Sequence, residues 1–178
     1  MAKEESAIIL DYLPNGYPLE GKMMPIAQAV GEANLTLLEL VPRKGLSLEP
    51  GEKVYIGEGK REKIYYILGR LHREKISESA KDQLQKFINQ VIKERKERFV
   101  KFFNESLPIN KRVHQIELLP GFGKKHMNEI LKARNIEPFK DFEDMKKKIQ
   151  NLPDPEKAIE KRIIQELTNQ ERYNLFTQ

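Results

Sequence analysis

The fold of this chain is organised around one stretch, Leu119-Pro120-Gly121-Phe122-Gly123-Lys124-Lys125. Apolar residues recur at helical spacing before it, over residues 112–118, and after it, over residues 127–131. Pro120 cannot continue the first helix, because it has no N–H donor and clashes with the preceding turn. The stretch therefore predicts two helices joined by a very tight turn.

The composition of this turn predicts an anion site at the start of the second helix. We expect Gly121 and Gly123 to adopt positive φ and to allow a close backbone approach. Two lysines at a helix N-terminus oppose the helix dipole, and a phosphate bound there would remove the conflict. His126, in the first helical turn, either touches that phosphate or is only exposed. The predicted binding residues are Arg112, Gly121, Phe122, Gly123, Lys124, Lys125 and His126.

Residues 113–134 resemble the helix-hairpin-helix motif, in which the amides of a glycine hairpin bind sugar-phosphate backbone without reading sequence. Met127 departs from the motif, which usually has a small residue there, and its larger side chain would open the angle between the helices. The alternative is a plain helix-turn-helix corner whose glycines only relieve steric crowding.

The motif is repeated once in a modified form. Ile116-x-x-Leu119-Pro120 is matched by Ile149-x-x-Leu152-Pro153, and Ile130-Leu131 by Ile163-Ile164, each 33 positions later (149 − 116 and 163 − 130). In the second copy the two glycines are replaced by Asp154 and Glu156, whose carboxylates repel phosphate. The sequence thus predicts a tandem helix-hairpin-helix domain over residues 106–178, with one binding hairpin and one structural hairpin.

Residues 1–75 form the first predicted domain, a small β-barrel. Five short apolar runs separated by Pro- and Gly-containing turns predict five strands, at residues 7–13, 26–32, 35–41, 54–56 and 64–68. Such a set suggests a closed or partly open barrel, OB-like as the first choice and SH3-like as the second. The predicted fold class is therefore α+β.

A basic loop in this domain is a second candidate surface. Lys60, Arg61 and Lys63 lie between two predicted strands that carry Tyr55, Tyr65 and Tyr66. Aromatic side chains beside a basic groove are typical of surfaces that bind single strands. Adjacent strand residues face opposite sides, so at least one of Tyr65 and Tyr66 could instead belong to the core.

A long helix over residues 76–105 is expected to link the two domains, with Ser77 or Ser79 as its cap. The mixed charges of residues 93–98 indicate a solvated helix face. Acidic residues from Asp141 onward open a further helix. The C-terminal tail carries Tyr173, Leu175 and Phe176, which either dock on the barrel or bind a partner protein.

Composition limits the function classes. The net charge of +5 is concentrated near the hairpin, because residues 111–134 carry six basic and two acidic side chains whereas residues 1–75 carry eleven of each. With no cysteine the chain has no disulfide and no thiolate metal site. No run is apolar enough to span a membrane, and the first residues lack the apolar core of a signal peptide. We expect a cytoplasmic protein.

The sequence shows no catalytic motif. Its three histidines, at positions 72, 114 and 126, lack metal-ligand spacing, and no nucleotide P-loop occurs. Carboxylates are plentiful, so a metal site assembled only in three dimensions stays open. We expect no enzyme activity, no cofactor and no metal.

The order of barrel, long helix and hairpin pair resembles, over nearly the full chain, an archaeal family of uncharacterised proteins. That resemblance implies binding of nucleotides or nucleic acid but supplies no activity. We predict a non-sequence-specific nucleic-acid-binding protein, with single-stranded or structured RNA slightly favoured over DNA. The alternatives are a protein–protein interaction adaptor and a nuclease-type enzyme with an unrecognised carboxylate-metal site.

Overall fold

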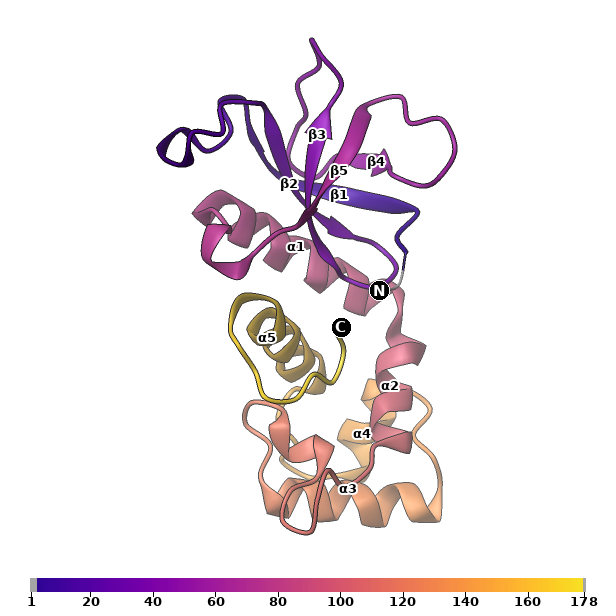
Figure 1. The fold of residues 1–178 in the computed structure, drawn as a ribbon. Coiled ribbons are helices and arrows are strands. Elements are labelled where there is room, and N and C mark those ends of the chain that lie inside the picture. The colour runs from indigo at the N-terminus through magenta and orange to yellow at the C-terminus, as the bar shows by residue number, and fades with distance from the viewer. Residues whose placement is uncertain (1–2, 178) are drawn as a thin grey trace. The chain divides into compact units, whose positions relative to one another are not determined.

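The computed structural model describes residues 3–177 and has a mixed α+β architecture (Figure 1). The chain forms two compact units. Among the described residues, one unit contains 3–87 together with 166–177, and the other runs from Ile88 to Gln165. Within residues 3–177, no helix has the length and apolar character needed to cross a membrane.

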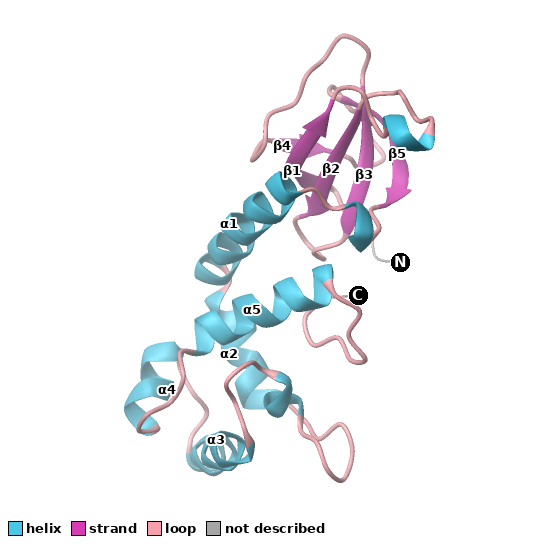
Figure 2. Cartoon of the chain, turned by 90° about the vertical axis from the view of Figure 1, so that its left-hand side faces the viewer, coloured by secondary structure: helices cyan, strands magenta, loops and turns pink. Residues whose placement is uncertain are grey.

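The first unit is built on a curled antiparallel sheet of five strands in the order β4-β1-β2-β3-β5 (Figure 2). No ladder joins the edge strands β4 and β5 within the described chain, so the sheet is a half-barrel. The five predicted strands are confirmed; the OB-like and SH3-like assignments stay predictions. Their bounds are β1 Ser6–Leu13, β2 Ile26–Gly31, β3 Leu37–Pro42, β4 Lys53–Tyr55 and β5 Ile64–Arg70.

The central strand β2 and its neighbour β3 are buried along their whole length. Ala29, Leu40, Val54 and Ile64 belong to one apolar cluster of the sheet. Gln28 is fully buried and polar, and its amide group donates to Lys75 O at 2.6 Å and accepts from Ser77 N at 3.0 Å. This pairing satisfies the buried amide and connects the sheet to the start of the next helix.

The predicted linking helix is interrupted. Helix α1 spans Glu78–Glu94 and α2 spans Lys96–Glu105, with Arg95 between them at φ −119° and ψ 40°. Ser77 caps α1 as expected, because its Oγ accepts from Ala80 N at 3.0 Å. The rest of the helical structure comprises α3 Lys124–Ile136, α4 Phe142–Lys148 and α5 Pro155–Thr168, with 3-10 turns η1 Pro18–Glu20, η2 Arg73–Lys75 and η3 Gln115–Leu118.

The helix predicted before the hairpin is wrong, because only the turn η3 forms there. Asn110 Oδ1 accepts from Arg112 N at 2.8 Å and from Val113 N at 2.9 Å. Such local side-chain bonds compete with helix formation, and Pro120 ends the segment seven residues later (120 − 113). The helix predicted from Asp141 is confirmed, with Asp141 Oδ1 accepting from Asp144 N at 2.7 Å.

Candidate nucleic-acid interface

The two glycines of the first hairpin have different roles. Gly121 has φ +85°, the left-handed region that disfavours other residues, whereas Gly123 is extended at φ −108° and ψ −168°. Positive φ is therefore confirmed at Gly121 and wrong at Gly123. A Cβ at Gly121 would lie 4.0 Å from Pro153 Cβ in the second hairpin, whereas a Cβ at Gly123 would meet nothing within 4 Å.

The start of α3 is open. Gly123 stands at the N-cap and supplies no side-chain acceptor, and the intrahelical bonds begin with Met127 N donating to Gly123 O at 3.0 Å. The amide N–H groups of residues 124–126 precede that bond and lie at the positive end of the helix dipole. Helices α1 and α4, by contrast, are capped by Ser77 and Asp141.

The second hairpin closes its own helix start. Asp154 Oδ1 accepts from Glu156 N at 3.0 Å and from Lys157 N at 3.2 Å. Pro155 is the first residue of α5, so this helix begins two positions earlier in the repeat than α3, which begins at Lys124 (124 + 33 = 157). A carboxylate of the chain thus caps α5, whereas no side chain caps α3.

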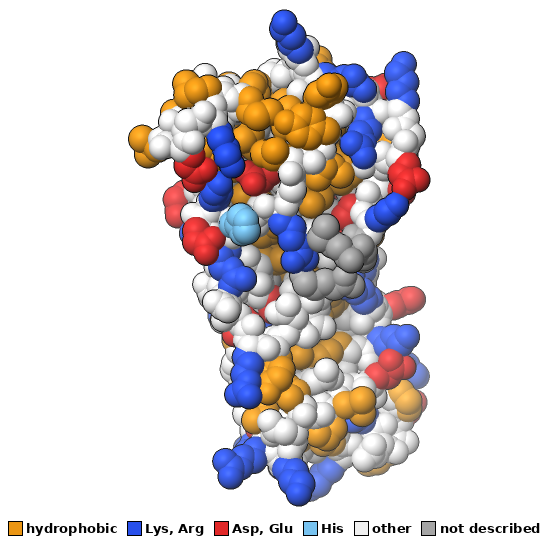
Figure 3. Space-filling model, in the orientation of Figure 1, with side chains coloured by type: hydrophobic (Ala, Val, Ile, Leu, Met, Phe, Trp, Pro, Cys, Tyr) orange, Lys and Arg blue, Asp and Glu red, His pale blue; other side chains and the backbone are white. Residues whose placement is uncertain are grey.

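Of the three basic residues considered at the first hairpin, one has its side chain bonded to other residues of the hairpin region, and two are exposed. Lys124 Nζ donates to Arg112 O at 2.7 Å and lies 3.0 Å from Glu117 Oε1. The side chains of Lys125 and Arg112 are exposed. Figure 3 shows Lys and Arg side chains at the α3 end of the helical unit. All three side chains are exposed, but Lys124 ties the hairpin to the preceding loop, whereas Lys125 and Arg112 make no such tie in the described chain.

Two predicted binding residues prove to have structural environments. Phe122 is 4% exposed, and its ring packs inside the unit with its centroid 6.0 Å from that of the Phe103 ring. His126 is half-buried, with its ring 5.8 Å from that of Phe122. Phe122 thus anchors the turn from inside, which corrects its expected place in the interface.

A buried histidine supports the turn before the hairpin. His114 Nδ1 accepts from Ile116 N at 3.2 Å, and Glu117 Oε2 accepts from His114 N at 2.7 Å, so the two residues cap η3 reciprocally. Burial lowers the pKa of His114, and the charge of Arg134 lowers it further. The hydrogen bond from His114 N, aided by Lys124, lowers the pKa of Glu117. The neutral imidazole and the ionised carboxylate are the forms that fit this turn.

The basic loop of the sheet is less available than its sequence suggests. Lys63 forms an ion pair with Glu52, and Arg61 Nε donates to Gly57 O at 2.8 Å. Lys60 is exposed. Tyr65 is 63% exposed and Tyr66 is half-buried, as opposite faces of a strand require.

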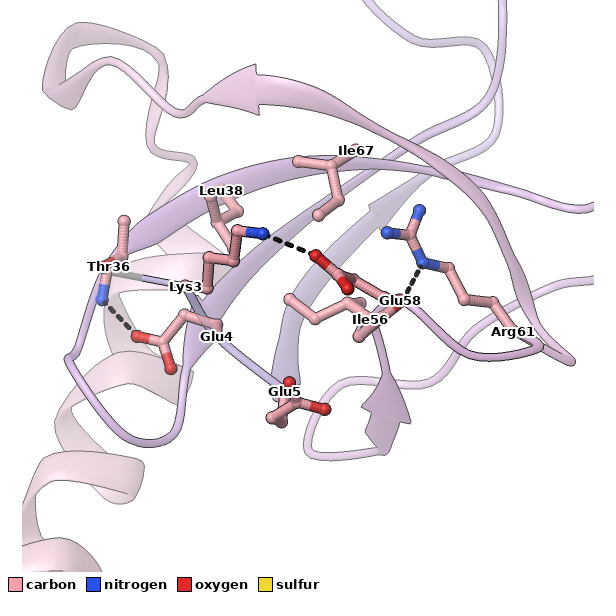
Figure 4. A pocket seen from close by; sticks show the side chains of 10 residues that line it. Lys3, Glu4, Glu5, Thr36, Leu38, Ile56, Glu58, Arg61 and Ile67 are labelled. Atoms are coloured by element: carbon pink, nitrogen blue, oxygen red, sulfur yellow. Dashed lines mark hydrogen bonds and ion pairs between the residues drawn. The ribbon is translucent and has the colours of Figure 1, made fainter. Parts of the chain in front are cut away.

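A hollow of about 270 Å³ lies beside this loop (Figure 4). Its lining includes Glu4, Glu5 and Glu58. Glu4 is itself used by the fold, because its carboxylate accepts from Ala33 N at 2.9 Å and Asn34 N at 2.8 Å. The lining also carries Lys3, which pairs with Glu58, and Arg61, so its carboxylates outnumber its cations by one (3 − 2) and it offers a polyanion no net positive charge. Among residues 3–177, no group of three or more His, Asp or Glu side chains could hold a metal ion.

Comparison with known proteins gives the family. Residues 3–178 match the family model described as "Protein of unknown function (DUF655)". The chain belongs to this family. It is 39% identical over 175 residues to the "Uncharacterized protein MJ0038" of Methanocaldococcus jannaschii, covering 97% of this chain and 79% of that protein. The homologues matched here are archaeal, as the sequence suggested.

The fold also matches a solved DUF655 structure. The crystal structure of Af1531 from Archaeoglobus fulgidus aligns with a TM-score of 0.82 at 42% identity, covering 98% of this chain and all (100%) of that one. This match supports the mixed α+β architecture of the chain.

Proposed function

We propose that this DUF655 protein binds nucleic acid without sequence preference, through the hairpin at residues 119–125. One observation carries the proposal: α3 begins at a glycine without a side-chain cap, whereas the equivalent turn of the second hairpin is capped by Asp154. Backbone N–H groups at a helix start bind phosphate oxygens well. A backbone phosphate would take the place that the Asp154 carboxylate takes before α5.

The side chains around the open helix start suit a phosphate backbone. Lys125 and Arg112 are exposed and carry positive charge, and Lys124 holds the loop that bears Arg112. Contacts to phosphate carry no sequence information, so binding should depend little on base sequence. With two to four phosphate contacts, log affinity should fall with log salt at a slope of about −2 to −4. RNA is favoured slightly over DNA, because Tyr65 offers an exposed ring to unpaired bases.

The test is the substitution Gly123→Asp, which gives α3 the kind of cap that α5 has. The position accepts a side chain, since Gly123 is extended and its Cβ direction is empty. The new carboxylate would occupy the amides and repel phosphate. Losing a hydrogen-bonded charge contact costs about tenfold or more in affinity. Fluorescence anisotropy with labelled single-stranded RNA and duplex DNA at low salt measures this loss, and the melting temperature should stay equal or rise.

Two matched variants separate charge from geometry. Gly123→Ala adds a Cβ without an acceptor and should bind as the wild type does. Gly123→Asn adds a neutral acceptor and should fall between alanine and aspartate. Wild-type affinity in the folded Gly123→Asp protein would contradict the proposal, and a salt-independent affinity would favour a protein-binding adaptor instead.

A further inference from the structure

The first unit contains a second hollow, of about 500 Å³, whose lining differs from that of the acidic one. It lies between the turn after β3 and the start of β5, and its lining includes Tyr12, Tyr65, Arg43 and Lys44. None of its lining residues is Asp or Glu. Two aromatic rings and two cations without an opposing carboxylate match a ligand that is flat and apolar at one end and anionic at the other.

The exposed ring in this hollow is held in place. Tyr65 is 63% exposed, and its ring meets that of Tyr66 edge-on, with centroids 5.3 Å apart and an interplanar angle of 74°. Edge-to-face contact leaves one face of a ring open for stacking. Tyr12, on β1, is partly buried and donates from its hydroxyl to Leu46 O at 3.4 Å. The aromatic part of the hollow is thus built before any ligand arrives.

The cations are carried by a tight turn. Leu46 N donates to Arg43 O at 3.1 Å, and Gly45 within that turn has φ +84°. Arg43 Nε donates to Arg61 O at 2.7 Å, which fixes the guanidinium while its terminal amino groups remain to bind an anion. Figure 3 shows hydrophobic side chains gathered at this end of the sheet, with a cationic side chain at the tip of the loop.

We propose that this hollow binds one unpaired nucleotide, with its base stacked on Tyr65 and its phosphate met by Arg43 and Lys44. Base-on-aromatic stacking beside cations is how proteins hold unpaired bases. The nucleotide is either free or part of a single strand, since both present the same base and phosphate. This site lies in the first unit and does not depend on the hairpin at residues 119–125.

The experiment compares a base-bearing probe with a base-free one, using the full chain. The probes are a fluorescent single-stranded oligouridylate and an abasic oligonucleotide of the same length and charge. Tyr65→Ala should weaken binding of the oligouridylate about 5- to 150-fold and leave the abasic probe unchanged. Tyr65→Phe should retain affinity because it keeps the ring. Tyr65→Leu, which is apolar but not aromatic, should behave like alanine.

A second arm identifies the source of the nucleotide and separates this site from the hairpin. Tyrosine fluorescence, titrated with uridine and adenosine monophosphates, reports binding of free nucleotides. Lys44→Glu should weaken both the monophosphates and the oligouridylate, whereas Gly123→Asp should weaken both oligonucleotides and spare the monophosphates. The proposal is overturned if Tyr65→Ala binds the oligouridylate normally, if it weakens the two oligonucleotides equally, or if the wild type binds neither monophosphates nor oligouridylate.

Discussion

The two hairpins of this chain share an apolar frame and differ in how their second helix begins. Ile116 and Ile149 are both buried, at 0% and 4% exposure. Before α5 the amides are closed by Asp154, and before α3 they are left open by Gly123. The apolar residues of such a repeat therefore specify its packing, whereas two turn residues decide whether it presents a binding surface.

The largest expected effect separates the two glycines of the first hairpin. Gly121→Ala should lower the free energy of unfolding by about 1–2 kcal/mol, because a Cβ is disfavoured at φ +85°. Gly123→Ala should lower it by only about 0.5 kcal/mol, because the site is extended and open and the loss comes only from alanine being a poorer N-cap than glycine. Urea denaturation measures both. Equal losses would show that the hairpin needs two glycines for steric reasons alone.

The next effect concerns the cap of the second hairpin. Asp154→Ala removes the acceptor for Glu156 N and Lys157 N and should cost about 1 kcal/mol of stability. Nucleic-acid affinity, measured below the unfolding transition, should not fall, because the lost carboxylate repels phosphate. Asp154→Asn is the control, since it keeps an acceptor and should recover most of the stability. A marked loss of affinity in Asp154→Ala would mean that the second hairpin also binds.

The sequence predicted the frame of the hairpin pair better than its turns. The 33-residue repeat and the Leu-Pro pairs located both turns, because apolar spacing and proline are strong local signals. That these turns form a tandem helix-hairpin-helix domain stays a prediction. The shift of α5 by two positions could also have been predicted: Asp154-Pro155 is a typical N-cap followed by a first-turn proline. The break at Arg95 could not, since no glycine or proline marks it.

Side-chain contacts explain why several predicted site residues have structural roles that the sequence did not indicate. A sequence shows that Lys63 and Lys124 are cationic, but not that Glu52 and Glu117 are their partners. Phe122 could be a surface or a core residue by its type, and only tertiary packing against Phe103 decides. Arg43 and Lys44 were missed, although their turn before Gly45 is a visible signal in the sequence.

The stability of the first hairpin should depend on pH in a way that the second does not share, because a buried histidine, His114, caps the turn before the first hairpin. Protonating His114 Nδ1 would turn the acceptor for Ile116 N into a donor. Since the folded pKa is lowered, the unfolded chain binds the proton first. Stability should therefore be unaffected above about pH 6.5 and fall as the pH drops below that value through the folded pKa.

Thermal melting between pH 8 and pH 5 tests this prediction. The His114→Asn variant keeps a capping acceptor without a titrating group, so its melting temperature should vary less with pH in that window. His72→Asn, at an exposed position, is the matched control and should follow the wild type. The stabilisation that comes from the lowered pKa of Glu117 is fully present above the ordinary carboxyl range and is lost only below it, so it does not vary between pH 8 and pH 5. Parallel curves for His114→Asn and the wild type would exclude His114 as the cause.

The smallest expected effect compares one lysine in each hairpin. Lys125 and Lys157 are both exposed and both lie in the first turn of their helices. They differ mainly in the cap of the helix, which is Gly123 before α3 and Asp154 before α5. Lys124 is unsuitable for this comparison because it also bonds to Arg112 O and Glu117. Lys125→Ala should weaken binding equally for all sequences and reduce the magnitude of the salt slope by about 1. Lys157→Ala should leave the slope unchanged, because Asp154 already occupies the amides beside it. If Lys157→Ala reduced the slope as much as Lys125→Ala, phosphate binding would depend only on the general positive charge of the surface. The open start of α3 would then not be the phosphate site.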